Sequence, residues 1–131
     1  MPILNVKVSA VKSPQLTGQI AGLLLELTTR ILKKRRDLTP IAIDYVDPDC
    51  WVIAAVPLSE QGKSSFYVDI RVTDETNTKD EKAQYIREVF DGFARILGQL
   101  HEESYIHVHD VRAASYGYGG LTQEYRYHHG A

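Results

Sequence analysis

The second residue of the chain is a proline, and the stretch MPILNVKVSA continues at once with the alternating residues of a β-strand. If Met1 is removed, the ring nitrogen of Pro2 becomes a free secondary amine, and the ring fixes the direction of its lone pair. A free α-amino group has a pKa of about 7.7–8.0 in short peptides, and partial burial or nearby cations lower that pKa. Such an amine can act as a general base near neutral pH. If Met1 is retained, the nitrogen is an amide and this chemistry is lost.

A basic run, KKRR at residues 33–36, is the second feature that could contact a substrate. Cations at the end of a helix also suit the negative end of the helix dipole, and we interpret Lys33 and Lys34 in that way. Arg36 fits a surface position and a substrate contact equally well, because a guanidinium can grip a carboxylate through two parallel hydrogen bonds.

The segment HVHD at residues 107–110 raises the question of a metal site, because His107 and His109 would share one face of a strand. No third ligand follows at a defined spacing, and structural metal sites need a complete ligand set. We therefore predict no metal, and nothing else in the sequence indicates a cofactor.

The composition limits the class of protein. The 131 residues suit one domain, residues 1–131, and carry 15 Lys and Arg against 17 Asp and Glu, for a net charge of -2. This balance does not favour nucleic-acid binding, which usually needs a strongly basic surface. The one cysteine, Cys50, cannot form an intramolecular disulfide, and the N-terminus lacks a secretory signal pattern. Since no stretch approaches about 18 apolar residues, we expect a cytoplasmic protein that does not bind membranes.

The sequence contains an internal repeat. Residues 2–9 align with residues 66–73 at an offset of 64, the Val and Ile positions coincide, and both segments alternate as half-buried strands do. Residues 41–47 and 106–112 form a second pair of strands at a nearly equal offset of 65.

Signals for a helix lie between the two strands of each half. Ser13 can cap a helix that has Pro14 at its first position, and Thr78 with Glu81 forms a capping box before the second helix. Apolar residues recur at helical spacing after both caps. The two β-α-β pseudo-repeats cover about residues 2–48 and 66–112.

Two β-α-β units predict an α+β fold in which a four-stranded mixed sheet carries both helices on one face. The chain has no helix left to cover the other face, so we predict oligomerisation through it, as a homotrimer. Between the halves, residues 51–56 predict a short edge strand or hairpin, followed by a loop. The alternating EYRY at residues 124–127 predicts a last short strand.

The N-terminal proline, the duplicated β-α-β unit and the stretch SYIHVHDVRAASYGYGGLTQEYR near the end occur together in this chain. In this combination the sequence resembles the tautomerase superfamily, which includes 4-oxalocrotonate tautomerase and macrophage migration inhibitory factor. The match in the tail rests on Tyr105 with Ile106, and on the run DVRAASYGY at residues 110–118. The resemblance implies a homotrimer with active sites at the subunit interfaces.

The resemblance also implies roles for individual residues. Pro2 would be the general base that moves a proton between carbon and a carbonyl-conjugated position. Tyr105 aligns with an active-site tyrosine that is expected from a neighbouring subunit, where it would shape the pocket or donate a proton. Arg36, with Arg35 one step away, aligns with a basic residue that would hold a substrate carboxylate and stabilise the dienolate.

Five further residues are candidates for substrate contacts. His107 stands where the inhibitory-factor branch has an asparagine, which is a departure from the family pattern. Arg71 and Arg112 are additional candidate cations, and Trp51 and Tyr118 are candidate apolar walls of the pocket.

The implied function is that of a tautomerase or isomerase acting on a small 2-keto or 2-hydroxydienoic acid, without a cofactor. Two alternatives stay open at this point. One is another superfamily reaction on a small acid, namely hydration, dehalogenation or decarboxylation. The other is a non-catalytic binding protein on the same scaffold, because a fold does not by itself determine a function.

Overall fold

The computed structural model of the protein describes residues 2–130. In chain order the elements are β1 (Ile3–Val8), α1 (Pro14–Arg30), the 3₁₀ turn η1 (Arg36–Leu38), β2 (Ile41–Tyr45), the 3₁₀ turn η2 (Pro48–Cys50), β3 (Val52–Ile53), β4 (Val56–Pro57), α2 (Leu58–Gln61), β5 (Phe66–Thr73), α3 (Lys79–Leu97), β6 (Tyr105–Val111), β7 (Gly117–Tyr118), β8 (Leu121–Thr122) and α4 (Gln123–His129). Among these residues, no helix is both long enough and apolar enough to cross a bilayer. The cytoplasmic location stays a prediction.

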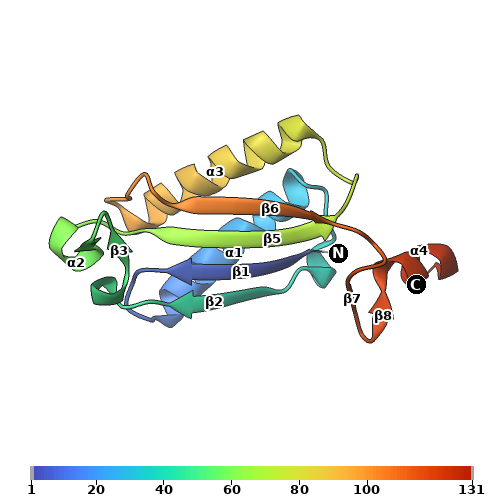
Figure 1. The fold of residues 1–131 in the computed structure, drawn as a ribbon, viewed down its shortest axis with the longest axis horizontal. Helices are drawn as coiled ribbons and strands as arrows, with labels where there is room; N and C mark the ends of the chain where they lie inside the picture. The colour runs from blue at the N-terminus through green and yellow to red at the C-terminus, as the bar shows by residue number, and fades with distance from the viewer. Residues whose placement is uncertain (1, 131) are drawn as a thin grey trace.

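The main sheet has four strands in the order β2-β1-β5-β6 (Figure 1). The β1–β2 and β5–β6 pairs are parallel, and the central β1–β5 pair is antiparallel, so the sheet is mixed as predicted. In that central pair Asn5 lies opposite Asp69, the same two residues that the internal repeat aligns. The two halves are therefore related by an approximate twofold axis that passes through this pair.

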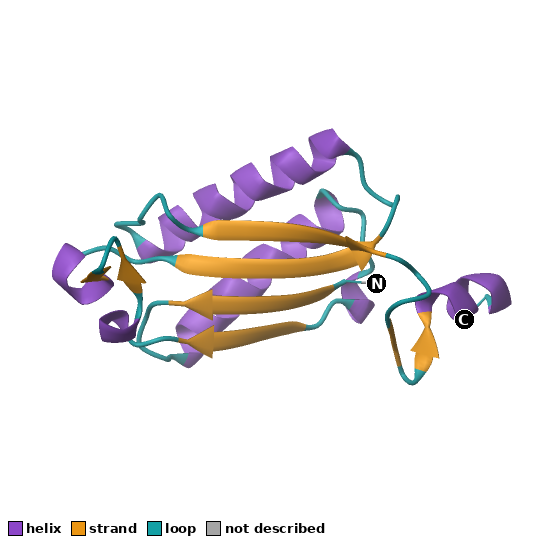
Figure 2. Cartoon of the chain, in the orientation of Figure 1, coloured by secondary structure: helices purple, strands orange, loops and turns teal. Residues whose placement is uncertain are grey.

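Both long helices pack on the same face of the sheet (Figure 2), which confirms the predicted fold class. The side chain of Ser13 accepts a hydrogen bond from the backbone N–H of Leu16 and starts α1. Thr78 and Glu81 form both bonds of the predicted capping box at the start of α3. These caps supply acceptors for N–H groups that the first turn of a helix leaves unpaired.

The core lies between the two helices and the inward side chains of the strands. On the α3 side, Phe93 stacks on Phe66 with ring centroids 4.0 Å apart. The hydroxyls of Tyr85 and Thr28 pair at 2.9 Å, and burial raises the pKa of Tyr85 to about 12. The inward strand positions that are fully or almost fully buried are Leu4, Val6, Val8, Phe66, Val68, Ile70 and Val72.

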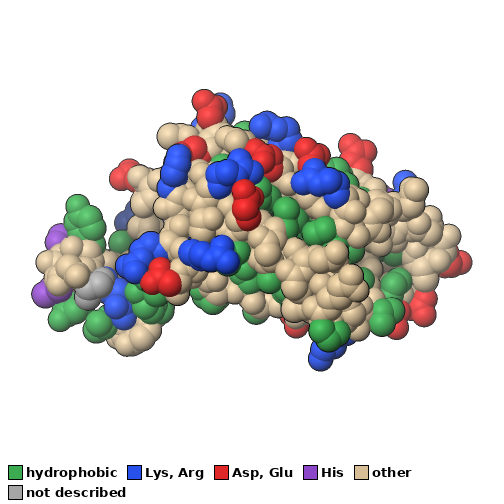
Figure 3. Space-filling view, turned by 180° about the vertical axis from the view of Figure 1, so that it is seen from behind, with side chains coloured by type: hydrophobic (Ala, Val, Ile, Leu, Met, Phe, Trp, Pro, Cys, Tyr) green, Lys and Arg blue, Asp and Glu red, His purple; other side chains and the backbone are tan. Residues whose placement is uncertain are grey.

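The outer surface of the helix layer is polar. In the view from behind the sheet, acidic and basic side chains are interspersed over it (Figure 3). Arg30, for example, contacts Glu26 on its own helix and Glu88 on α3, each at 2.7 Å. Within residues 2–130 no helix covers the opposite face of the sheet. This face is polar in its middle, where Asn5, Asp69 and His107 lie side by side on three strands.

Two local predictions need correction. The segment after the β3–β4 hairpin, predicted as a loop, contains the single helical turn α2, which ends at Gly62 in a left-handed conformation. The EYRY segment is not a strand but part of α4, because the side chain of Thr122 caps the helix by accepting from the N–H of Tyr125. The ring of Tyr125 then stacks on His129 one turn later, an arrangement that only a helix allows at this spacing. The hairpin of β3 and β4 is confirmed.

Candidate active site

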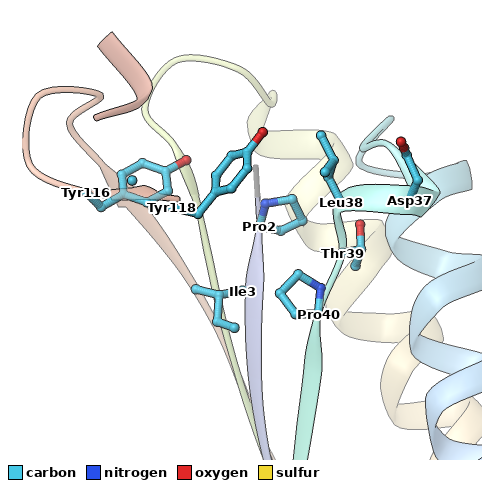
Figure 4. A pocket seen from close by; sticks show the side chains of 9 residues that line it. Pro2, Ile3, Asp37, Leu38, Thr39, Pro40, Tyr116 and Tyr118 are labelled. Carbon is cyan, nitrogen blue, oxygen red and sulfur yellow. The ribbon is translucent and has the colours of Figure 1, made fainter. Parts of the chain in front are cut away.

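A pocket of about 500 Å³ opens at the end of the sheet where β1 begins (Figure 4). Three segments that are far apart in the sequence form it: the start of β1, the turn η1 with the chain leading into β2, and the C-terminal hairpin. The residues that line it are Pro2, Ile3, Asp37, Leu38, Thr39, Pro40, Tyr116, Gly117 and Tyr118.

Pro2 lies at the base of this pocket and is buried. It immediately precedes a central strand, and the N–H of Leu4 donates to the carbonyl of Pro40 at 3.1 Å, which ties the beginning of β1 to the segment entering β2. Figure 4 shows the Pro2 ring between Tyr118 on one side and Leu38 with Thr39 on the other. Pro2 is therefore fixed at the start of β1, one of the two central strands of the sheet.

The second wall is the segment around η1. The carboxylate of Asp37 accepts two hydrogen bonds from the guanidinium of Arg35, from Nε at 3.2 Å and from Nη2 at 2.8 Å. The hydroxyl of Thr39 donates to the carbonyl of Arg35 at 2.6 Å and tightens the turn. Arg36 is exposed next to these residues, and within residues 2–130 it makes no ion pair.

The third wall is the C-terminal hairpin. Tyr116 is anchored to β5 by a short hydrogen bond between its hydroxyl and that of Thr73, and burial raises the pKa of its phenol. Tyr118 is held from α4, because Arg126 Nη2 donates to the Tyr118 carbonyl at 2.8 Å and the guanidinium carbon lies 3.9 Å from the ring centroid. A cation over an aromatic face at this distance is attractive.

The structure thus brings together some of the residues that the sequence singled out. Pro2 and Tyr118 line the same pocket, and Arg36 is adjacent to its lining residues Asp37 and Leu38. Arg35 points its guanidinium at Asp37, and its Nε and Nη2 donors bond to that carboxylate.

Tyr105 is not at this pocket in its own protomer. It lies at the level of Tyr67 and Lys7, five residues along β1 from Pro2, which corresponds to about 17 Å at the usual rise of a strand. Its hydroxyl donates to Glu103 at 2.7 Å, and this bond raises the pKa of the Tyr105 phenol. The side chain is well exposed, at 61%. A role for Tyr105 beside Pro2 therefore requires a second copy of the chain, as the resemblance implied.

His107 and Arg71 lie on the uncovered face of the sheet. His107 stacks on His109 with ring centroids 3.7 Å apart, and Asp69 lies 3.8 Å from His109 and 3.7 Å from Arg71. One oxygen of Asp69 is buried without a hydrogen-bond partner in the described part of the chain. No group of three His, Cys, Asp or Glu residues there has an arrangement that could hold a metal ion. Arg71 is opposite Ile3, near the pocket end of this face.

Two other candidates lie outside the pocket in the protomer. Trp51 precedes the β3–β4 hairpin, which Figure 1 shows at the opposite end of the sheet from the N-terminus. Arg112 follows the last residue of β6 and is exposed. The sequence analysis missed Asp37, Thr39 and Tyr116 as pocket residues. The only signal for them was their closeness in sequence to Arg36 and Tyr118.

By sequence alone, no protein-family model and no curated protein matches this chain. Solved structures, however, share its fold. A fused 4-OT described as a symmetric trimer aligns over 93% of this chain and 96% of its own, with a TM-score of 0.79 and 15% identity. Pt0534 inactivated by 2-oxo-3-pentynoate aligns over 94% of this chain and 97% of its own, with a TM-score of 0.81 and 10% identity. Leishmania major MIF2 aligns over 93% of this chain and 97% of its own, with a TM-score of 0.75 and 16% identity.

The chain therefore has the tautomerase fold, the four-stranded α+β architecture shared by the 4-OT and MIF structures. This confirms the fold that the resemblance implied. At these identities the likeness concerns the fold, so the function has to be argued from the site.

Proposed function

We propose that the protein is a tautomerase that uses the amine of Pro2, exposed by removal of Met1, as a general base on a small 2-keto or 2-hydroxydienoic acid. The observation that carries this proposal is the position of Pro2, which is buried and lines a pocket of about 500 Å³ together with Asp37 and Leu38, the two residues that follow Arg36 in the chain. An apolar pocket with a few polar groups is the usual form of a small-molecule site.

The chain's own residues can perform both proton transfers. In ketonisation the Pro2 nitrogen accepts the proton of the enol hydroxyl, and the released electron pair forms the carbonyl. The resulting ammonium then returns the proton to carbon, so the base is regenerated and nothing else is consumed. Arg36 would hold the substrate carboxylate and stabilise the negative charge of the dienolate between the two steps. Burial disfavours the charged form of an amine, so the position of Pro2 would favour the unprotonated base.

We also propose that the active form is a homotrimer that assembles through the uncovered face of the sheet, with Tyr105 of one copy completing the pocket of the next. The distance of Tyr105 from Pro2 in one protomer supports this arrangement, as does the exposure of its side chain. Structures of fused 4-OT are described as symmetric and asymmetric trimers.

Covalent labelling tests the nucleophilic nitrogen directly. 2-Oxo-3-pentynoate, the reagent that inactivates Pt0534, carries an alkyne conjugated to a ketone. The lone pair of Pro2 would add to the far alkyne carbon while the N–H proton moves to the neighbouring carbon, so the adduct keeps every atom of the reagent. We expect one full reagent mass on the N-terminal peptide and a parallel loss of phenylenolpyruvate or 2-hydroxymuconate turnover. Labelling at any other residue, with the N-terminus free and unmodified, would contradict the assignment of the base.

Gly117 provides a second test, because the pocket wall depends on a close approach at this residue. A Cβ added there would lie 1.9 Å from the carbonyl oxygen of Leu121, which is backbone and cannot move aside alone. We therefore expect Gly117→Ala to displace the hairpin and to lower kcat/KM by about 10²-fold, the effect of misplacing a binding group by roughly 1 Å. Gly22→Ala, where a Cβ meets nothing within 4 Å, is the matched control and should keep full activity. Equal activity of the two variants in a steady-state assay would remove the hairpin from the site.

A further inference from the structure

The charges around the pocket are unevenly distributed. Asp37 is the one lining residue that carries a formal charge, and the others are apolar, hydroxylic or glycine. Both of its oxygens accept from Arg35, so this acid and this cation form an exposed ion pair. Arg36 is then the neighbouring cation without an ion pair in the described chain.

Two other arginines near this end of the molecule are engaged elsewhere. Arg126 lies over the Tyr118 ring, donates to the backbone carbonyl of that residue, and does not line the pocket. Arg71 is on the uncovered sheet face, where Asp69 is 3.7 Å away. The chain segment that enters this wall of the pocket therefore carries a guanidinium without an ion pair in the described residues, that of Arg36, directly before the carboxylate of Asp37.

From this arrangement we infer that Asp37 restricts the pocket to substrates with a single carboxylate and an apolar or aromatic remainder; the inference rests on the proposed function. One carboxylate can bind Arg36 while the remainder lies against Leu38, Pro40 and Tyr118. A second carboxylate would meet the like charge of Asp37, and the Nε and Nη2 donors of Arg35 on that side are already used by Asp37. Asp37 is thus a specificity-determining residue, and phenylenolpyruvate fits the site better than the dicarboxylate 2-hydroxymuconate.

Asp37→Asn tests this directly, because it keeps the size of the side chain, removes the negative charge and releases Arg35. In this variant, the ratio of kcat/KM for 2-hydroxymuconate to that for phenylenolpyruvate should rise about fivefold, the effect of one unit charge at about 4 Å in water. The rise should shrink as salt is added, because the Arg35 and Asp37 side chains are 64% and 65% exposed. Asp49→Asn, at an exposed position on η2, removes the same charge away from the pocket and should leave the ratio unchanged.

A binding measurement separates this inference from the proposed function. Calorimetric titration with 3-phenylpropionate and with adipate compares one carboxylate with two and requires no turnover. Wild type should prefer 3-phenylpropionate. Asp37→Asn should shift the ratio of the two affinities toward adipate by about the same factor as the kcat/KM ratio. Arg35→Gln leaves the charge of Asp37 uncompensated and should shift the affinity ratio toward 3-phenylpropionate. An unchanged ratio in Asp37→Asn, or a wild-type preference for adipate, overturns the inference. If the ratio shifts as expected while blocking Pro2 leaves turnover intact, the charge selectivity stands and the base assignment fails.

Discussion

We expect a chain that retains a residue before Pro2 to lose about 10²- to 10⁴-fold in kcat, the usual contribution of a general base. In such a chain the Pro2 nitrogen stays acylated. An amide nitrogen has no basic lone pair, so the acylated proline cannot accept the enol proton. The measurement is phenylenolpyruvate ketonisation by the processed chain and by a chain extended by one residue, each verified by intact mass. Equal turnover by the two chains would show that Pro2 is not the base.

Pro2→Ala refines this experiment, because after Met1 is removed it keeps an amine but loses the ring that orients the lone pair. We expect its turnover to lie between those of the processed and the extended chains. Pro57→Ala, on the β3–β4 hairpin away from the pocket, is the control for loss of a proline as such. Both variants should unfold in the same range of urea concentration as wild type.

The pH profile should report the same group. The protonated amine cannot act as a base, so kcat/KM should fall as the pH is lowered through the pKa of Pro2 and should level off above it. A free α-amino group has a pKa of about 7.7–8.0, and the buried position of Pro2 should place the midpoint below that range. In the extended chain this ascending limb should disappear from the residual activity.

The fold could be predicted from the sequence because the strand and helix signals are local and occur in both halves of the chain. The alternation of residues 2–9 and 66–73 and the caps at Ser13 and Thr78 depend on neighbours a few residues away. The repeat even identified the central pair of the sheet, since Asn5 and Asp69 are aligned in sequence and opposite in space. An antiparallel pairing of two equivalent strands produces this coincidence.

The pocket could be predicted only in part, because its walls come from contacts across the molecule. Pro2 and Tyr118 were recognised from the resemblance, whereas the pairing of Asp37 with Arg35 depends on the tight turn before β2. The tail, residues 124–127, was predicted as a strand because its alternating pattern was given more weight than its helix cap. Its alternation resembles a strand, but the cap at Thr122 makes it a helix, and that helix supplies Arg126 to hold the pocket wall.

Removing the ring of Phe93 is expected to lower the free energy of unfolding by about 3–5 kcal/mol, as for other buried phenylalanines replaced by alanine. Phe93 is 0% exposed on α3 and stacks on Phe66 of β5 with an interplanar angle of 14°, so alanine would leave a cavity between the helix and the sheet. Ile86→Ala on the same helix, at 39% exposure, should cost less than about 1 kcal/mol.

Urea unfolding at one fixed protein concentration gives the comparison, because assembly would otherwise shift the apparent stability. A loss for Phe93→Ala no larger than for Ile86→Ala would mean that this ring does not anchor α3 to the sheet.

The same pair of variants separates the effect on stability from the effect on catalysis. Pro2 is placed by the start of β1, whereas Phe66, the stacking partner of Phe93, lies opposite Val8 at the other end of that strand. Neither phenylalanine lines the pocket. Turnover per folded molecule should therefore stay near the wild-type value in Phe93→Ala, even where total activity falls with the folded fraction.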